Sequence, residues 1–193
     1  MSVTRSHPHP GPLPAPTGKV HRRSLPVVLM PSLWFRCAEA GRDPVHYGTT
    51  GVSRFDDPRG EFGVLYAGVQ VEAAFVEVFG GKLALTDADL AARTVWSLVA
   101  IRPSRLVDLT GEGLAGLGLD ARISAADHGP AQAWSRAFFE HPDQPDGILY
   151  RSRRDPSRLA VAIYDREPWA FEATALPSGT LVQVAIRYGI LII

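Results

Sequence analysis

The sequence has almost no cysteine, very little lysine and no net charge, and each of these shortages excludes a class of protein. Cys37 is the only cysteine, so an intramolecular disulfide and a cysteine-based zinc site are excluded. This usage fits a reducing compartment. Twenty basic and twenty acidic side chains cancel, so no overall field draws the chain to nucleic acid or to a membrane. Any anion site must therefore be local.

Lysine is nearly replaced by arginine, because Lys19 and Lys82 are the only lysines. A compositional bias explains this, so the abundance of arginine is not in itself evidence for phosphate binding. No apolar run reaches the roughly 18 residues of a membrane span, and the first residues lack the apolar core of a signal peptide. We therefore expect a cytoplasmic protein that contacts neither membrane nor nucleic acid directly.

The first 30 residues differ in composition from the rest of the chain. Six prolines lie between Pro8 and Pro26, and no acidic residue precedes Glu39. Prolines spaced in this way favour an extended, unpaired backbone. His7 and His9 are too few ligands to predict a metal site there. The sequence thus predicts a flexible, proline-rich tail over residues 1–30 and one folded domain over residues 31–193.

Short apolar segments separated by turn residues dominate the predicted domain, which indicates an α+β fold built on one or two twisted sheets with a few short helices. The glycines over 111–118 predict a loop. The last residues are too apolar to be free, so the C-terminus should dock in the core or in an interface. Strands are predicted over 32–38, 62–68, 94–101, 105–109, 147–153, 158–165, 169–173 and 181–193, and helices over 70–79, 86–93 and 130–141.

Within this pattern, the stretch 54–81 carries charged side chains among residues that should be buried. It consists of a turn, a strand that is apolar on both faces and a short apolar helix. Arg54, Tyr66, Glu72 and Glu77 lie within it. Burying a guanidinium or a carboxylate costs several kcal/mol per ion unless the group is paired or holds a ligand. The stretch is therefore a candidate site.

The two glutamates of the predicted helix differ in their neighbours. At about 100° per residue, Glu77 points between Ala73 and Ala74, where the small side chains leave room for a ligand. Glu72 lies among bulky side chains near the helix start, where its charge favours the helix dipole. Glu77 is therefore the better site candidate, and Glu72 is expected to be structural.

Three further residues have both a structural and a functional interpretation. Arg36 lies inside a predicted strand, either as an edge-strand arginine whose head reaches water or as an anion ligand. Tyr66 is either a core residue with a satisfied hydroxyl or an aromatic that stacks on a planar ligand. Ser152 ends the apolar face of the strand over 147–153.

Several kinds of catalysis are unlikely on sequence grounds. There is no GxSxG motif, Cys37 has no evident base, and His46, His128 and His141 lack metal-ligand spacing, so no metal site is predicted. Arginines bind phosphate in bidentate fashion, and a carboxylate can stabilise an oxocarbenium-like transition state. These are the parts needed to break an N-glycosidic bond of a dinucleotide such as NAD. The residues left to supply them are Arg36, Arg54, Tyr66, Glu77 and Ser152.

The order and spacing of these residues resemble the RES domain family from about Leu33 onward. One departure is Phe35, because many members have a tyrosine before the first arginine, and any hydroxyl role there is lost. The proline-rich segment also lies outside the pattern. The matching pieces are Trp34-Phe35-Arg36, Arg54-Phe55, Val64-Leu65-Tyr66-Ala67, Ala74-Phe75-x-Glu77 and Gly147-Ile148-x-Tyr150-x-Ser152-Arg153.

The resemblance implies both a fold and a set of roles. It implies an ADP-ribosyltransferase-like fold of twisted, mostly antiparallel sheets. It implies that Arg54, Glu77 and Ser152 are the residues for which the family is named, with Arg36 and Tyr66 as further NAD-site residues. RES proteins are toxins of toxin–antitoxin pairs, each neutralised by an Xre-type helix-turn-helix antitoxin, with which this chain is expected to form an oligomer.

Three hypotheses follow for the activity. In the first, the chain degrades NAD⁺ as a glycohydrolase or phosphorylase, with NAD⁺ as substrate and no separate cofactor. In the second, the same site transfers ADP-ribose to a cellular protein. In the third, the chain is a non-catalytic nucleotide-binding module. The sequence does not choose the acceptor, because acceptor choice depends on loop shape.

Overall fold

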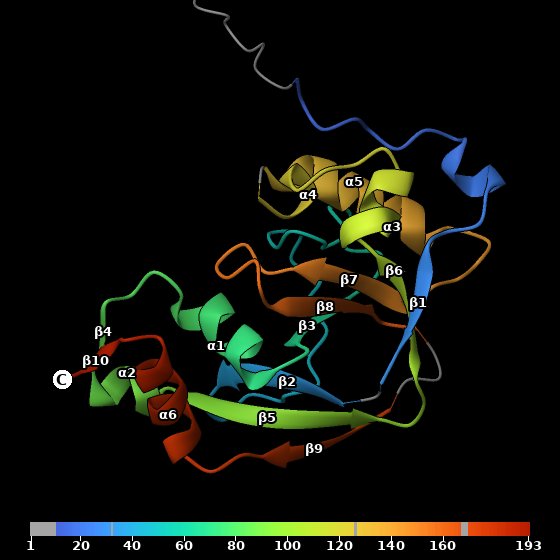
Figure 1. Cartoon of the computed structure of the whole chain (residues 1–193). Coiled ribbons are helices and arrows are strands. Elements are labelled where there is room, and N and C mark those ends of the chain that lie inside the picture. Colours follow the sequence, from blue (N-terminus) through green and yellow to red (C-terminus); the bar gives the residue numbers. More distant parts are fainter. Residues whose placement is uncertain (1–10, 32, 126, 167–169) are drawn as a thin grey trace, which may run out of the picture.

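The computed structural model describes residues 11–31, 33–125, 127–166 and 170–193. One strongly twisted sheet of eight strands, in the order β1-β6-β7-β8-β3-β2-β5-β9, forms its centre (Figure 1). Among the described strand pairs of this sheet, only β6 and β7 run parallel. The strands are β1 Val27–Met30, β2 Leu33–Glu39, β3 Val64–Gly68, β5 Arg93–Ala100, β6 Ser104–Asp108, β7 Gly147–Arg151, β8 Leu159–Tyr164 and β9 Phe171–Ala175.

The helices gather in two groups beside the sheet (Figure 1). α1, α2 and α6 lie together near β5 and the C-terminus, and α3, α4 and α5 lie near β6 and β7. This arrangement confirms the predicted α+β class with a mostly antiparallel sheet. The remaining elements are η1 Val20–Arg22, α1 Val71–Phe79, α2 Asp87–Ala91, α3 Gly111–Gly116, α4 Arg122–Ala125, α5 His128–Phe139, α6 Gly179–Arg187, β4 Ala84–Leu85 and β10 Leu191–Ile192.

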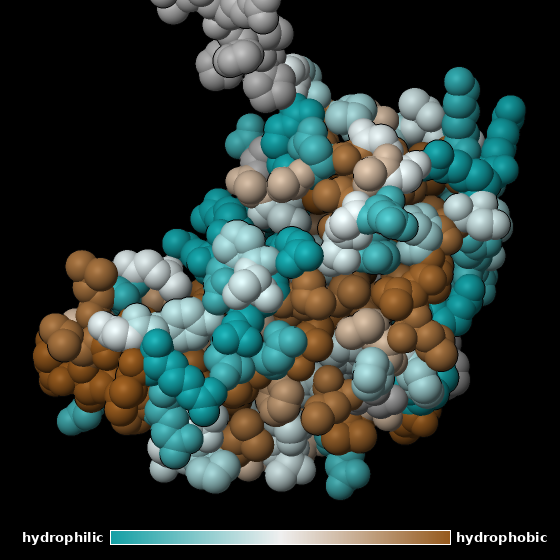
Figure 2. Space-filling view, in the orientation of Figure 1, coloured by the Kyte–Doolittle hydropathy of each residue, from teal (hydrophilic) through white to brown (hydrophobic). Residues whose placement is uncertain are grey.

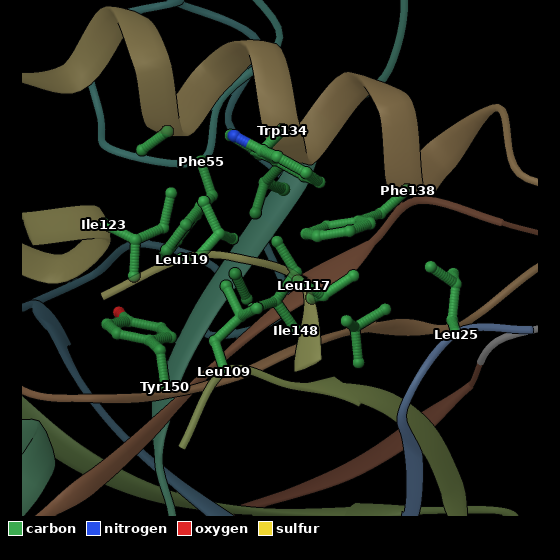
Figure 3. Close-up of a cluster of buried hydrophobic side chains, with 14 of the residues drawn as sticks. Leu25, Phe55, Leu109, Leu117, Leu119, Ile123, Trp134, Phe138, Ile148 and Tyr150 are labelled. Carbon is green, nitrogen blue, oxygen red and sulfur yellow. The ribbon is translucent and has the colours of Figure 1, made fainter. Parts of the chain in front are cut away.

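The central strands are buried on both faces because their side chains alternate between two apolar clusters. On β3, Val64 packs beneath α5, while Leu65 packs into a cluster that includes Trp34 of β2. Figure 3 shows the first cluster, in which Phe55, Trp134 and Phe138 lie below the α5 ribbon. This packing fixes the loop containing Phe55 against both the sheet and α5.

The helix α1 lies unusually close to β3, and Gly68 permits this. A Cβ atom added at Gly68 would come within 2.6 Å of the backbone nitrogen of Ala74 and within 2.7 Å of the Gln70 carbonyl oxygen. Only a residue without a side chain fits such an approach. The first turn of α1 is therefore held directly over the end of β3, which sets the position of the rest of the helix.

The predicted tail over residues 1–30 is corrected for residues 11–30. Leu13, Val20 and Leu25 are buried in the cluster beneath α5, and β1 pairs antiparallel with β6. The prolines keep this segment extended, but the leucines and valines between them carry enough apolar surface to pack on the domain. The rest of the predicted tail, residues 1–10 with their two histidines, lies outside the described residues.

Two other segments also differ from their predictions. The segment 179–187 is the helix α6, not a strand, because Leu181, Val184 and Ala185 follow helical spacing and are buried in one cluster with side chains of α1. The glycine-rich segment 111–116 is the short helix α3, not a loop. Among the described residues, no helix combines the length and apolarity that crossing a membrane requires.

The C-terminus docks through its backbone, because β10 pairs in parallel with β4. Its side chains stay largely outside the core, with Leu191 66% and Ile193 72% exposed. Leu83 and Ile186 are also exposed. Figure 2 shows the resulting apolar surface as a brown region over the end of the molecule that bears β4, β10 and α6.

Candidate functional site

One cavity of about 430 Å³ brings together four of the five predicted site residues. Its volume lies within the range of small-ligand sites. Arg36 comes from β2, Tyr66 from β3, Glu77 from α1 and Arg54 from the loop before β3. The full lining consists of Phe35, Arg36, Cys37, Val52, Ser53, Arg54, Tyr66, Ala67, Ala74, Glu77, Val78, Ser124, His128, Tyr150, Arg153 and Arg154.

Arg54 is half-buried on the cavity wall and lies in the field of several charged or ionisable groups. Burial lowers the pKa of its guanidinium, and the positive charge of Arg153 lowers it further. Tyr150 and Glu77 act in the opposite direction and raise it. The Arg54 Nη1 also donates to the carbonyl oxygen of Ile123 at 3.4 Å. Arg54, Arg153 and Glu77 are therefore close enough to act on one ligand.

The two glutamates of α1 point in different directions, as predicted from helical spacing. Glu77 is exposed and lines the cavity beside Ala74 and Val78. Glu72 instead accepts a hydrogen bond at 2.5 Å from Arg187 of α6, so it ties two helices together. Of the pair, only Glu77 has its carboxylate available to the cavity.

Tyr66 lines the cavity, but its hydroxyl is already engaged. The hydroxyl oxygen accepts a hydrogen bond from the Phe55 backbone N–H at 2.9 Å and donates to Asp56 Oδ1 at 2.9 Å. Burial raises the pKa of Tyr66 well above its ordinary value, and the Asp56 carboxylate raises it further. The hydroxyl therefore stays protonated and structural, and the aromatic ring is what Tyr66 offers to a ligand.

Arg36 is not an edge-strand residue, because β2 lies between β3 and β5. Its Nη1 donates to the carbonyl oxygens of Pro44 at 3.1 Å and His46 at 2.8 Å. Burial lowers the pKa of the guanidinium, against a smaller opposing effect of the Asp43 carboxylate. Arg36 thus holds the loop over 44–46 with one nitrogen while it lines the cavity.

Ser152 is the one predicted site residue that is not among the described residues lining the cavity. It is only 1% exposed, and its Oγ accepts backbone N–H groups from Arg154 at 3.1 Å and Asp155 at 3.3 Å. These bonds close the turn after β7. Because Arg153 and Arg154 of this turn line the cavity, Ser152 affects the site indirectly, by fixing the conformation of the turn.

Sequence reasoning did not single out Arg153, Arg154, Tyr150 or His128 as site residues. The available signal for the two arginines was their position, directly after a strand whose exit carries the Ser152 motif. His128 offered none, since it lies 74 residues beyond Arg54 in the sequence. Its Nδ1 donates to the Val52 carbonyl oxygen at 2.9 Å, which brings the start of α5 to the cavity.

The lining is strongly cationic, although the chain as a whole is neutral. Arg36, Arg54, Arg153 and Arg154 surround the cavity, and Glu77 is its one carboxylate among the described residues. Clustered guanidinium groups beside aromatic rings suit a planar ligand that carries phosphate. The described residues contain no group of three or more histidine, cysteine, aspartate or glutamate side chains arranged for a metal ion.

Comparison with known proteins identifies the family whose sequence pattern this chain matches. The model of the RES domain matches residues 33–183. The chain is 31% identical over 87 residues to a protein named Probable toxin y4kH from Sinorhizobium fredii (strain NBRC 101917 / NGR234), which covers 45% of this chain and 68% of that protein.

A solved structure shares the fold. A chain in the crystal structure of the M. tuberculosis MbcT–MbcA toxin–antitoxin complex matches with a TM-score of 0.61 and 16% identity, covering 83% of this chain and 92% of that chain. The two chains therefore share a fold, and the predicted α+β class with a mostly antiparallel sheet is confirmed. With a family match over most of its length, the chain belongs to the RES domain family.

Proposed function

We propose that this protein is the toxin of a toxin–antitoxin pair and that it cleaves the nicotinamide–ribose bond of NAD⁺. The observation that carries the proposal is the cavity that joins four arginines, two tyrosines and one carboxylate. Membership of the RES domain family supports it. The toxin role is supported by the S. fredii relative, which is named a probable toxin, and by the similar chain from a toxin–antitoxin complex.

The contacts within the cavity suggest how each residue would hold NAD⁺. Arg54 and Arg36, which both line the cavity, would together bind the pyrophosphate or nearby ribose oxygens through their guanidinium groups. Tyr66 would stack its ring on the nicotinamide ribose end, since its hydroxyl is engaged. Ser152 would fix the turn that presents Arg153.

Glu77 is the residue we assign to bond cleavage. When the C–N bond breaks, its electron pair leaves with nicotinamide and the ribose carbon becomes cationic. The Glu77 carboxylate on the cavity wall would stabilise that charge as it develops. Water, phosphate or a protein side chain then donates an electron pair to the ribosyl carbon. No separate cofactor takes part in this scheme, because NAD⁺ is the substrate.

Nicotinamide release tests the proposal. We expect antitoxin-free wild-type protein to release nicotinamide from NAD⁺, and Glu77→Gln to lower the rate on the order of 10²- to 10³-fold, the usual effect of losing a stabiliser of transition-state charge. Glu72→Gln is the matched control on the same helix and should keep near wild-type turnover. If wild type releases no nicotinamide, with or without phosphate, the proposal is wrong.

A second experiment, with labelled NAD⁺, identifies the acceptor of the ADP-ribosyl group. NAD⁺ labelled in its adenosine half, incubated with the protein and cell lysate, leaves its label in small molecules if water or phosphate is the acceptor. A labelled protein band would instead show ADP-ribosyl transfer. Saturable NAD⁺ binding without any turnover would indicate a non-catalytic nucleotide-binding module.

The partner of the proposed toxin would be an Xre-type helix-turn-helix antitoxin that forms an oligomer with it. An enzyme that consumes NAD⁺, as proposed here, would require restraint in the cell that produces it. If the gene beside this one encodes a helix-turn-helix protein, its co-expression should restore growth and yield a complex that co-purifies. Restored growth without a complex would contradict direct neutralisation.

A further inference from the structure

The loop that bears Arg54 is bonded along one side to a single face of α5. We call residues 51–55 the arginine loop. Three polar side chains of α5, at positions i, i+4 and i+7, each donate to its backbone carbonyl oxygens. The bonds run from His128 Nδ1 to Val52 at 2.9 Å, from Gln132 Nε2 to Gly51 at 2.7 Å and Ser53 at 3.0 Å, and from Ser135 Oγ to Phe55 at 2.7 Å.

Gln132 is the centre of this set. It is 8% exposed, and its amide nitrogen bonds two carbonyl oxygens of the loop. A buried amide must find such partners, because burying it unpaired costs free energy. Other faces of α5 pack into the apolar core through Trp134 and Phe138 (Figure 3). One face of this core helix is therefore polar, and its side chains bond the arginine loop.

The opposite side of the loop is held by β3. The Phe55 N–H donates to the Tyr66 hydroxyl, and Tyr66 in turn donates to Asp56. Asp56 is 2% exposed and accepts the Ser53 N–H at 3.0 Å. On either side of Arg54, the Phe55 N–H is thus bonded to Tyr66 of β3 and the Ser53 N–H to Asp56, while both carbonyl oxygens accept from side chains of α5. The Ser53 carbonyl oxygen also accepts from the Asp56 N–H at 3.2 Å.

We propose that Gln132 is a positioning residue for Arg54. Gln132 holds the arginine loop in the position from which the Arg54 guanidinium reaches the ligand. The proposal rests on the function proposed above for what Arg54 binds. Arg54 is half-buried and its Nη1 donates to the Ile123 carbonyl oxygen, so a shift of its backbone would disturb this contact and move the guanidinium. A displacement of about 1 Å at a binding group can cost on the order of a hundredfold in rate.

Gln132→Met is the sharpest test, because it removes both donors and nearly preserves volume. We expect kcat/KM for NAD⁺ to fall at least about tenfold, mainly through KM. In an Arg54→Ala background, Gln132→Met should change kcat/KM by less than about twofold, since the residue it positions is gone. A full additional loss in that background would overturn the proposal.

Two further variants separate positioning from stability. Ser135→Ala removes a donor to the same loop with little change in volume, and it should lower kcat/KM by several-fold in a folded protein. Phe138→Leu on the same helix should lower the melting temperature and leave kcat/KM within about twofold of wild type. If kcat/KM instead follows melting temperature across all three variants, Gln132 is merely structural and the proposal fails.

Hydrogen exchange gives a reading that does not depend on NAD⁺. In Gln132→Met the Ser53 and Phe55 amides should exchange on the order of tenfold faster, while those of β3 and β8 stay protected. Unchanged exchange in the loop would overturn the proposal. If the wild type releases no nicotinamide, the proposed function fails by itself, and the positioning role is then tested by growth inhibition. In that assay Gln132→Met should lose growth inhibition, and undiminished inhibition would refute the positioning role.

Discussion

At the scale of single residues, two hydroxyl groups of the candidate site are already engaged within the protein. Tyr66 and Ser152 both belong to the family pattern, yet their oxygens are bonded to neighbouring backbone and to Asp56. What they contribute is the placement of arginines: Tyr66 holds the loop of Arg54, and Ser152 closes the turn of Arg153. The hydroxyl groups that shape the cavity wall are therefore distinct from the charged groups that would act on a ligand.

Tyr66→Phe tests this division of labour. The substitution keeps the ring but removes the donor to Asp56 and the acceptor of the Phe55 N–H. Leaving buried polar groups unpaired costs about 1–3 kcal/mol, so the free energy of unfolding in urea should fall by that amount. Tyr150→Phe, on the same cavity wall, is the comparison. An unchanged unfolding free energy for Tyr66→Phe would show that the buried hydroxyl bonds contribute nothing to stability.

Cys37 gives a second test at this scale, because its thiol lines the cavity yet is buried. Burial raises its pKa to about 11, against a smaller lowering by Arg93. The thiolate is the reactive form, so a raised pKa means less thiolate at pH 8. Iodoacetamide should react on the order of a hundredfold more slowly than with a free cysteine of pKa near 8.5, and the rate should rise as pH approaches 11. A fast, pH-independent reaction would contradict this.

At the scale of elements, the sequence predicts structure where the local signals agree. The apolar runs of β3 and α1 agree with the glycines that follow them, and the Thr86–Asp89 capping box starts α2 as expected. The segment 179–187 misled because Leu-Val-Gln-Val-Ala-Ile is rich in β-branched residues and fits a strand as well as a helix. Packing against α1 decides for the helix, and packing of that kind is not a local property.

The candidate site shows the same limit. Glu77 could be chosen from the sequence because helical spacing fixes its direction on α1. Arg54 lies in a turn, and it could be chosen because it is a charged residue beside a buried strand and matches the family pattern. The role of Gln132 could not, because its partners lie about 80 residues earlier in the chain. Nor could the contact between Arg36 and the loop over 44–46, because the shape of that loop has no sequence period.

Leu181 and Ile186 of α6 should differ in their effects on stability, because one is buried and the other exposed. Leu181 is 4% exposed and packs in the cluster shared with α1, whereas Ile186 is 65% exposed. Leu181→Ala should lower the free energy of unfolding by about 2–5 kcal/mol through cavity formation, and Ile186→Ala should change it by less than about 0.5 kcal/mol. Equal losses in urea denaturation would contradict the burial of Leu181 against α1.

At the scale of the whole molecule, the proline-rich segment belongs to the support of the site. Trp134 of α5 donates from its indole nitrogen to the Pro14 carbonyl oxygen at 2.7 Å, and the His141 ring contacts the carbonyl oxygens of Val20 and Arg23 at 3.1 Å. The segment therefore packs on α5 from one side, while the arginine loop is bonded to α5 on another. Support extends from the segment through α5 to Arg54.

A variant that begins at Pro31 tests this continuity, because it keeps every residue of the predicted domain and removes the segment. Its loss exposes the contacts of Leu13, Val20 and Leu25, each worth about 1.5–3 kcal/mol in buried apolar surface, and it removes β1 from the edge of the sheet. We expect the urea midpoint to fall and the hydrogen exchange of the arginine loop to rise. Since α5 transmits the change, NAD⁺ turnover should fall with it, although no cavity residue is deleted. Equal urea midpoints for the full chain and the shortened variant would show that the segment is a tail. A lower midpoint with unchanged hydrogen exchange in the arginine loop would show that the segment supports α5 but not the loop.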